Sequence, residues 1–175
     1  MKPMHNKILF VISLFILCFS CKKTQENTSA DATEQSIRQE ITEKDISKIK
    51  YVEYALDLKT EDTIEDWVEY SQLQDLITDV KKGDLSFFND NKTVIKLLLK
   101  ELKSNIPEQV NSASITARIL VLETKLYKLE SLSNLSTTSK EELIAVIKEF
   151  LVSFSNLNMQ MNKKIEFDSR SIEKP

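Results

Sequence analysis

Apolar residues recur at alternating spacings of four and three in two long segments of this sequence, and this pattern constrains the fold more than any other feature. Such spacing places one apolar stripe along each of two helices. The short polar connector predicts that these helices fold back as an antiparallel hairpin, over about residues 108–134 and 139–167. The stripe residues are Ile115, Ile119, Leu122, Leu126 and Leu129, followed by Ile144, Ile147, Leu151, Phe154, Asn158, Met161 and Ile165.

Both predicted helices carry further apolar side chains beside the stripe, so a hairpin alone would leave apolar surface in contact with water. The single glycine, Gly83, and the lone internal proline, Pro107, are too few for a chain built of many tight turns. We therefore expect an all-α fold, a bundle of about four helices. The extra apolar residues are Leu120, Val121 and Tyr127 on the first helix, and Leu143, Val146, Phe150 and Leu157 on the second.

Two more helices are predicted before the hairpin. Residues 60–82 have apolar side chains at helical spacing, and Gly83 can take the left-handed conformation that ends a helix. Asn91 is the expected N-cap of the next helix, which reaches Asn105. Residues 37–58 follow no clear pattern; we expect a helix over residues 37–49, with an extended segment after it as the alternative.

The N-terminus has the order of charged and apolar residues that is typical of secretory signal peptides. Residues 1–7 contain two lysines and no acid, and residues 8–19 are apolar apart from Ser13. As a helix this apolar run would span about 18 Å, well short of the roughly 30 Å hydrocarbon core of a bilayer. We therefore expect residues 1–20 to be a removable export signal.

The end of the apolar run, Leu17-Cys18-Phe19-Ser20-Cys21, resembles the lipobox of bacterial lipoproteins, in which a small residue precedes an obligatory cysteine. Ser20 and Cys21 match this pattern, whereas Cys18 and Phe19 stand where Leu and a small residue are more usual. The resemblance implies cleavage after Ser20 and a covalent lipid on Cys21, with no other cofactor. Several acyl chains would make the attachment effectively permanent. The alternatives are a plain signal peptide, an uncleaved anchor, and Cys18 as acceptor, although the bulky Leu17 disfavours Cys18.

The same resemblance implies a place in the bacterial envelope, where the lipid anchors the chain to a membrane. No Asp follows Cys21, and this favours the outer membrane, with the protein facing the periplasm or the cell surface. Residues 21–36 are predicted to be the lipidated cysteine and a flexible tether, because they contain no large apolar side chain. Residues 37–170 are expected to form one helical-bundle domain, and residues 171–175 a disordered C-terminus.

Charge and histidine content exclude several classes of function. Without the predicted signal the chain keeps 22 basic and 27 acidic residues, a formal charge of −5, which argues against nucleic acid as a partner. The only histidine, His5, lies in the signal, so no Ser–His, Cys–His or histidine-ligated zinc site is expected in the mature protein. We expect no catalytic and no metal-binding residues; a carboxylate-pair hydrolase is the remaining enzymatic alternative.

An acidic run lies between Glu53 and Asp79, with nine acids and one base, Lys59. Our preferred interpretation is that these acids face the lysines of the following helix, so that two neighbouring helices have complementary charge. The alternative is a surface that binds a cation or a basic partner. The lysines in question are Lys92, Lys96, Lys100 and Lys103.

Two further features are candidates for function. Asn158 falls in the apolar stripe, within an amide-rich segment over residues 156–162, and a buried amide there usually fixes helix register; the alternative is a ligand-binding groove. Phe87 and Phe88 are adjacent in a connector, where we expect a plug over the end of the bundle; the alternative is a contact with a partner.

These observations predict a non-catalytic, lipid-anchored helical protein that binds another component of the bacterial envelope through its helix faces or the Phe87-Phe88 loop. The alternative is a lipoprotein that binds a small ligand or a cation. Such a protein would use the acidic helix over residues 60–82 or the amide cluster over residues 156–162.

Overall fold

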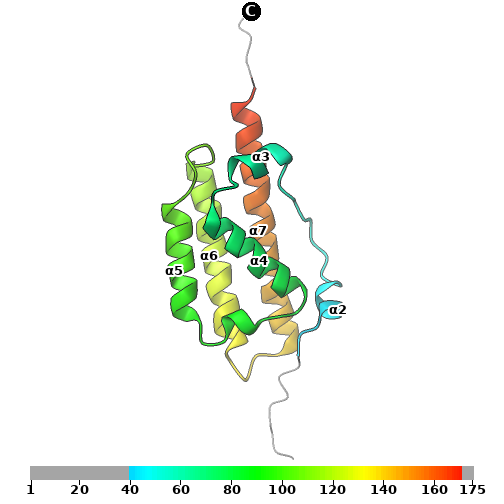
Figure 1. Ribbon diagram of the computed structural model, residues 1–175. Coiled ribbons are helices and arrows are strands. Elements are labelled where there is room, and N and C mark those ends of the chain that lie inside the picture. The colour runs from blue at the N-terminus through cyan, green and yellow to red at the C-terminus, as the bar shows by residue number, and fades with distance from the viewer. Residues whose placement is uncertain (1–39, 171–175) are drawn as a thin grey trace, which may run out of the picture. The chain divides into compact units, whose positions relative to one another are not determined.

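The structure, a computed structural model, describes residues 40–170. The expected signal, Cys21, the whole of the expected tether and residues 171–175 lie outside the described residues. Within residues 40–170 the regular secondary structure consists of six α-helices and one short 3-10 helix, without a strand (Figure 1). The all-α prediction is therefore confirmed.

The predicted hairpin is formed by α6 (Ala113–Ser133) and α7 (Lys140–Asp168), which lie side by side along most of their length (Figure 1). Helix α6 begins five residues later than expected, because residues 107–110 form a turn that buries Val110 completely. Serine hydroxyls cap both helices: the Ser112 Oγ accepts a hydrogen bond from the Ile115 N–H, and the Ser139 Oγ accepts one from the Glu142 N–H.

The apolar stripes of the hairpin form the centre of the core. All five stripe residues of α6 are fully buried, and so are Phe150 and Leu157 beside the stripe of α7. The extra apolar surface of α6 is not covered as expected, because Leu120 and Val121 remain 50% and 46% exposed. Further helices therefore pack on one side of α6 and leave its outer side in contact with solvent.

Helices α4 (Val68–Lys81) and α5 (Lys92–Ser104) complete the four-helix bundle. Helix α5 lies beside α6, and α4 runs obliquely to the hairpin helices (Figure 1). The Tyr70 ring of α4 stacks on Phe154 of α7 at a centroid distance of 5.7 Å, so α4 packs directly on the hairpin. The expectation of about four bundled helices is confirmed.

Residues 60–82 do not form the single helix that we expected. Helix α3 (Leu58–Thr63) ends before α4 begins, and the interruption places Ile64 and Trp67 in the core at 3% and 1% exposure. The Trp67 ring stacks on Tyr70 at 5.6 Å. Burial of these large side chains outweighs the few helical hydrogen bonds that the break removes.

The predicted stop at Gly83 is confirmed. Gly83 has φ of 85°, its N–H donates to the Val80 carbonyl, and the Asp84 N–H donates to the Asp79 carbonyl. This is the hydrogen-bond pattern of a Schellman cap. The absence of a side chain serves a second purpose, since a Cβ atom on Gly83 would lie 2.8 Å from the Ile41 carbonyl oxygen.

The expected helix over residues 37–49 is reduced to α2 (Glu43–Ile46), and residues 37–39 lie outside the described part. Residues 47–57, which we call the strap, contain no regular secondary structure and run alongside α7 (Figure 1). The Asp45 carboxylate pairs with Lys140 near the start of α7, and the Asp57 N–H donates a hydrogen bond to Asn162 further along it. The twelve residues from Asp45 to Asp57 therefore cover the length of 22 residues of α7, about 33 Å. A helix of twelve residues would cover only about 18 Å, so this segment must be extended.

Candidate functional site

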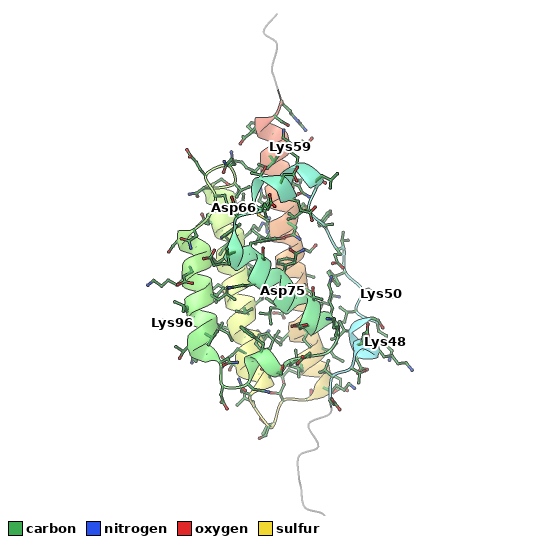
Figure 2. All side chains as sticks on the ribbon, viewed as in Figure 1. Lys48, Lys50, Lys59, Asp66, Asp75 and Lys96 are labelled. Atoms are coloured by element: carbon green, nitrogen blue, oxygen red, sulfur yellow. The ribbon has the colours of Figure 1, made fainter. Side chains whose placement is uncertain are left out.

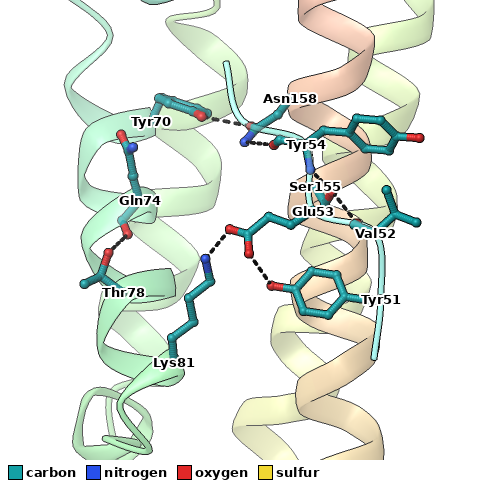
Figure 3. Close-up of polar contacts among 10 residues, drawn as sticks. All are labelled: Tyr51, Val52, Glu53, Tyr54, Tyr70, Gln74, Thr78, Lys81, Ser155 and Asn158. Carbon is teal, nitrogen blue, oxygen red and sulfur yellow. Dashed lines mark hydrogen bonds and ion pairs between the residues drawn. The ribbon is translucent and has the colours of Figure 1, made fainter. Parts of the chain in front are cut away.

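Three polar side chains of α7 hold the backbone of the strap, and Figure 3 shows two of them, Ser155 and Asn158. They are Ser155, Asn158 and Asn162, which we call the ladder; their spacing of three and four residues places them on one side of the helix. The Ser155 Oγ accepts a hydrogen bond of 2.8 Å from the Tyr54 N–H and donates one of 2.9 Å to the Val52 carbonyl. Ser155 therefore satisfies a donor and an acceptor of the strap at once.

The two asparagines of the ladder act in the same way. The Asn158 amide group donates to the Tyr54 carbonyl at 3.1 Å, and its Oδ1 accepts from the Tyr70 hydroxyl at 2.8 Å. The Asn162 amide donates to the Ala55 carbonyl at 2.8 Å, and its Oδ1 accepts from the Asp57 N–H at 3.0 Å. Five hydrogen bonds thus join the ladder to the strap, and all five end on strap backbone atoms.

One strap side chain adds a charged contact. The Glu53 carboxylate pairs with the Lys81 ammonium of α4 and accepts a hydrogen bond of 3.2 Å from the Tyr51 hydroxyl (Figure 3). Burial, together with the nearby Glu53 charge, raises the pKa of Tyr51 to about 12, so this hydroxyl stays protonated and able to donate. Glu53 therefore connects the strap to α4 while the ladder connects it to α7.

The strap is held by polar contacts together with a few partly buried apolar side chains. Its Val52 and Tyr54 side chains are 66% and 40% exposed, whereas Ser155 and Asn158 beneath them are buried at 2% and 5% exposure. Ile49, Tyr51 and Leu56 of the strap also pack against the core, and each of these side chains is only partly buried. The face formed by the ladder, Tyr70 and Lys81 is called the strap-binding face below.

Burial also raises the pKa of Tyr70 well above its usual value, which keeps the hydroxyl protonated and donating to Asn158. The prediction that Asn158 is buried in the apolar stripe is confirmed. Its contacts differ from those expected of a residue that fixes the register of two helices, because its partners are Tyr70 and the strap. Asn156 and Gln160, in the same amide cluster, form no side-chain hydrogen bond with residues 40–170.

The expected ion pairs between the acidic run and α5 are not formed. Among the described residues only Glu53 and Asp79 of the run take part in ion pairs, with Lys81 and Lys82. Lys103 pairs instead with Glu123 of α6 at 2.7 Å. Figure 2 places Lys96 at the outer edge of α5 and Asp75 on α4, and both residues are exposed. Exposed ion pairs stabilise a fold only weakly, so helix packing follows the apolar side chains rather than these charges.

The two phenylalanines occupy the 3-10 helix η1 (Ser86–Phe88) at one end of the bundle. Phe88 is fully buried, Phe87 is partly buried, and their rings meet edge to face at 5.9 Å. These positions fit the predicted plug, and Phe88 has no exposed surface for a partner. Asn91 is the N-cap residue of α5 by position, but its side chain donates to the Phe87 carbonyl instead of capping the helix as expected.

A cleft of about 790 Å³ opens at the same end of the bundle, between α2, the turn at Gly83 and the connector of the hairpin. Lys140 at its edge pairs with Asp45 at 2.7 Å and donates to the Glu40 carbonyl at 3.2 Å. The hydrogen bond from Lys140 is the main reason why the pKa of Asp45 lies well below its usual value. Both lysines that line the cleft are thus engaged in ion pairs, Lys140 with Asp45 and Lys82 with Asp79, and we find no nucleophile paired with a base among its described residues.

Cys21 and Ser20 lie outside the described residues, so the structure does not bear on the lipobox. In residues 40–170 no helix combines the length and the apolar character needed to cross a membrane. No three His, Cys, Asp or Glu side chains within that range are arranged as metal ligands. No protein-family model, curated protein or solved structure matches this chain.

Proposed function

We propose that this chain is a lipid-anchored, non-catalytic protein of the bacterial envelope that binds another envelope protein. The lipobox-like end of the apolar run supports lipid attachment at Cys21 and cleavage after Ser20. The lack of an Asp after Cys21 favours the outer membrane, with the bundle on the periplasmic side or at the cell surface. The polar composition of residues 22–36 supports a tether that holds the bundle away from the lipid headgroups.

One structural observation carries the binding part of this proposal. The bundle holds an extended piece of polypeptide, its own strap, through five hydrogen bonds from side chains to backbone. Recognition of backbone is a common way in which proteins bind extended segments of partners. A protein held at a membrane gains from such a surface, because anchoring raises the local concentration of both partners.

The lipid attachment is tested by growing cells with a radioactive fatty acid. We expect label in the wild-type protein and in Cys18→Ala, and none in Cys21→Ala, since only Cys21 follows a small residue. Label that persists in Cys21→Ala would contradict the assignment. Cys18→Ala is the matched control, because it removes the other cysteine of the same segment.

Partner binding is tested by placing a photo-crosslinking amino acid at Gln74, which lies beside Leu56 and Tyr70, and separately at Leu120 on the outer side of α6. We expect one defined crosslinked protein from Gln74 in intact membranes, and none from Leu120. Without a crosslink at either position, binding of an envelope protein would be contradicted. A calcium-dependent rise in melting temperature would then favour the alternative of a cation-binding lipoprotein that uses the acidic segment over residues 60–82.

A further inference from the structure

We infer that the strap-binding face is a binding site for an extended, acidic peptide segment of a partner protein, and that the strap occupies this site in cis as a displaceable substitute. The inference deepens the proposed function and rests on it for the existence of a partner. It names the chemistry of the segment that the partner presents: an extended backbone with a carboxylate three residues before an apolar side chain.

The first argument is that the ladder recognises backbone and not sequence. Ser155 and Asn162 each contact one N–H and one carbonyl of the strap, and Asn158 contacts a third carbonyl. Any extended segment offers the same groups at the same spacing. The ladder can therefore bind another peptide without any change in its own side chains.

The second argument concerns the side chains that give specificity. Glu53 pairs with Lys81, and Leu56 packs against the core between α3 and α4. Val52 and Tyr54 are exposed, so these positions place little restriction on a ligand. The strap thus defines which peptides fit: an acid at the position of Glu53, an aromatic residue at that of Tyr51 and an apolar residue at that of Leu56.

The third argument is that the strap can leave without unfolding the bundle. Between residues 50 and 56 no backbone–backbone hydrogen bond joins the strap to other described residues. Its two ends are held independently, by the buried Ile41 and Ile46 around α2 and by the buried Thr60 in α3. Segments with few buried apolar contacts and side-chain anchors open locally at low free energy. The strap can therefore move outward as a loop while α2 and α3 stay in place.

Attachment in cis also predicts how the site is regulated. A covalently linked segment competes at an effective concentration on the order of millimolar, so a free peptide binds the closed protein weakly. Loosening the strap removes this competition and raises the affinity for a peptide in trans. The strap then acts as an autoinhibitory segment that precedes helices α3 to α7 in the sequence.

The test uses the full chain in detergent micelles and a fluorescent synthetic peptide with the sequence of residues 50–57, Lys-Tyr-Val-Glu-Tyr-Ala-Leu-Asp. Tyr54→Pro in the protein removes the N–H that donates to Ser155 and leaves the strap-binding face intact. We expect fluorescence anisotropy to give at least tenfold tighter binding to Tyr54→Pro than to the wild type. A peptide that carries Lys at the position of Glu53 should bind several-fold more weakly than the original peptide, because it replaces an exposed ion pair with Lys81 by a contact between like charges.

The matched control uses two asparagines of α7. Adding Asn158→Ala to Tyr54→Pro should abolish peptide binding, whereas adding Asn156→Ala should leave it unchanged. Of these two asparagines, Asn158 contacts the strap and Asn156 does not. Circular dichroism reports whether the helices remain folded in each variant. Glu53→Ala, which removes the pair with Lys81, provides a second way to loosen the strap if Tyr54→Pro does not fold.

Hydrogen exchange of residues 50–57 decides the remaining outcomes. Absence of peptide binding in a folded variant whose strap exchanges freely would overturn the inference, and so would a strap that stays protected in both variants. Neither result touches the proposed function, since the crosslink from Gln74 in membranes reports partner binding independently. Conversely, tight binding of the peptide without any crosslinked partner would leave the site intact and contradict the proposed function.

Discussion

The Tyr70 hydroxyl donates a hydrogen bond of 2.8 Å to the Oδ1 of Asn158, in the interior between α4 and α7 (Figure 3). The same amide donates through its nitrogen to the Tyr54 carbonyl of the strap. One buried side chain therefore joins two helices and the strap. Polar groups that are buried with all their partners present specify a unique arrangement, and removal of one partner leaves the others unsatisfied.

Replacement of Asn158 by Leu should destabilise the protein by about 2–3 kcal/mol, because the Tyr70 hydroxyl and the Tyr54 carbonyl both lose their partner. Urea denaturation followed by circular dichroism measures the change. Asn156→Leu is the matched control: it lies on the same helix, is only partly buried and makes no side-chain hydrogen bond within residues 40–170, so its effect should stay within about 0.5 kcal/mol. Equal effects of the two variants would contradict the role of Asn158.

Trp67 is the only tryptophan and is 1% exposed, so its fluorescence should be blue-shifted in the folded protein and shift to the red on unfolding. Trp67→Ala should destabilise the bundle by about 3–5 kcal/mol, because it opens a cavity beside Tyr70. Trp67→Phe should destabilise the bundle less than Trp67→Ala, since it keeps an aromatic ring and removes an indole N–H that has no hydrogen-bond partner among the described residues. Val68→Ala, at an exposed neighbouring position, should have little effect. A red emission maximum in the native state would refute the burial of Trp67.

Gly83→Ala should destabilise the protein by about 1–3 kcal/mol, because the residue has φ of 85° and its new Cβ would lie 2.8 Å from the Ile41 carbonyl oxygen. Thermal denaturation measures the loss. Lys82, the residue before Gly83, has a right-handed helical backbone conformation. Lys82→Ala should therefore leave the melting temperature nearly unchanged. A similar melting temperature for both variants would mean that the chain does not make the close approach at Gly83.

The Asp45–Lys140 pair should make stability depend on pH in the acid range. Lys140, and after it the Thr42 hydroxyl, hold the folded-state pKa of Asp45 well below its ordinary value of 3.8. A lowered pKa in the folded state means that the contribution is fully present above the unfolded-state pKa, and is lost as the pH falls through the folded-state pKa. The stability difference between wild type and Asp45→Asn should therefore be constant from pH 7 to about pH 5 and narrow below about pH 4.

Urea titrations at several pH values measure this difference. Glu43→Gln is the control, because Glu43 lies in the same short helix, is exposed and forms no ion pair within residues 40–170. Its stability difference from the wild type should change little over the same range. If the gap between wild type and Asp45→Asn widened as the pH fell, the assigned direction of the shift would be wrong.

The hairpin could be predicted because its information is local. Ile115 to Leu129 in α6 and Ile144 to Ile165 in α7 repeat with the period of a helix, and every stripe residue except the partly buried Ile144 lies in the core. Helix caps are equally local, which explains why the stop at Gly83 was predictable from sequence. The start of α4 could not be predicted from the sequence, because Ile64 and Trp67 continue the helical spacing. The helix is nevertheless interrupted there, and the interruption buries both side chains.

The candidate site was predicted only in part. Asn158 stands out as an amide in an apolar stripe, and its burial follows from its position in that stripe. Ser155 and Asn162 share its side of α7, a relation visible in their spacing, but nothing local indicates that residues 52–57 lie against them. The lysines of α5 illustrate the opposite error: their charge pattern suggested pairs with α4, and solvent competes too well for exposed charges to decide packing.

The sequence by itself determined the all-α class, the two long helices and the stop at Gly83, because periodicity and capping depend on residues a few positions apart. The lipobox at Ser20 and Cys21 is likewise a local pattern, and its chemistry stays a prediction. Only the tertiary structure decided where the break before α4 falls, which side of α6 remains exposed, and what Asn158 contacts. These depend on residues about one hundred positions apart, such as Tyr54 and Ser155, whose contact is created by burial of the whole core and not by any short segment.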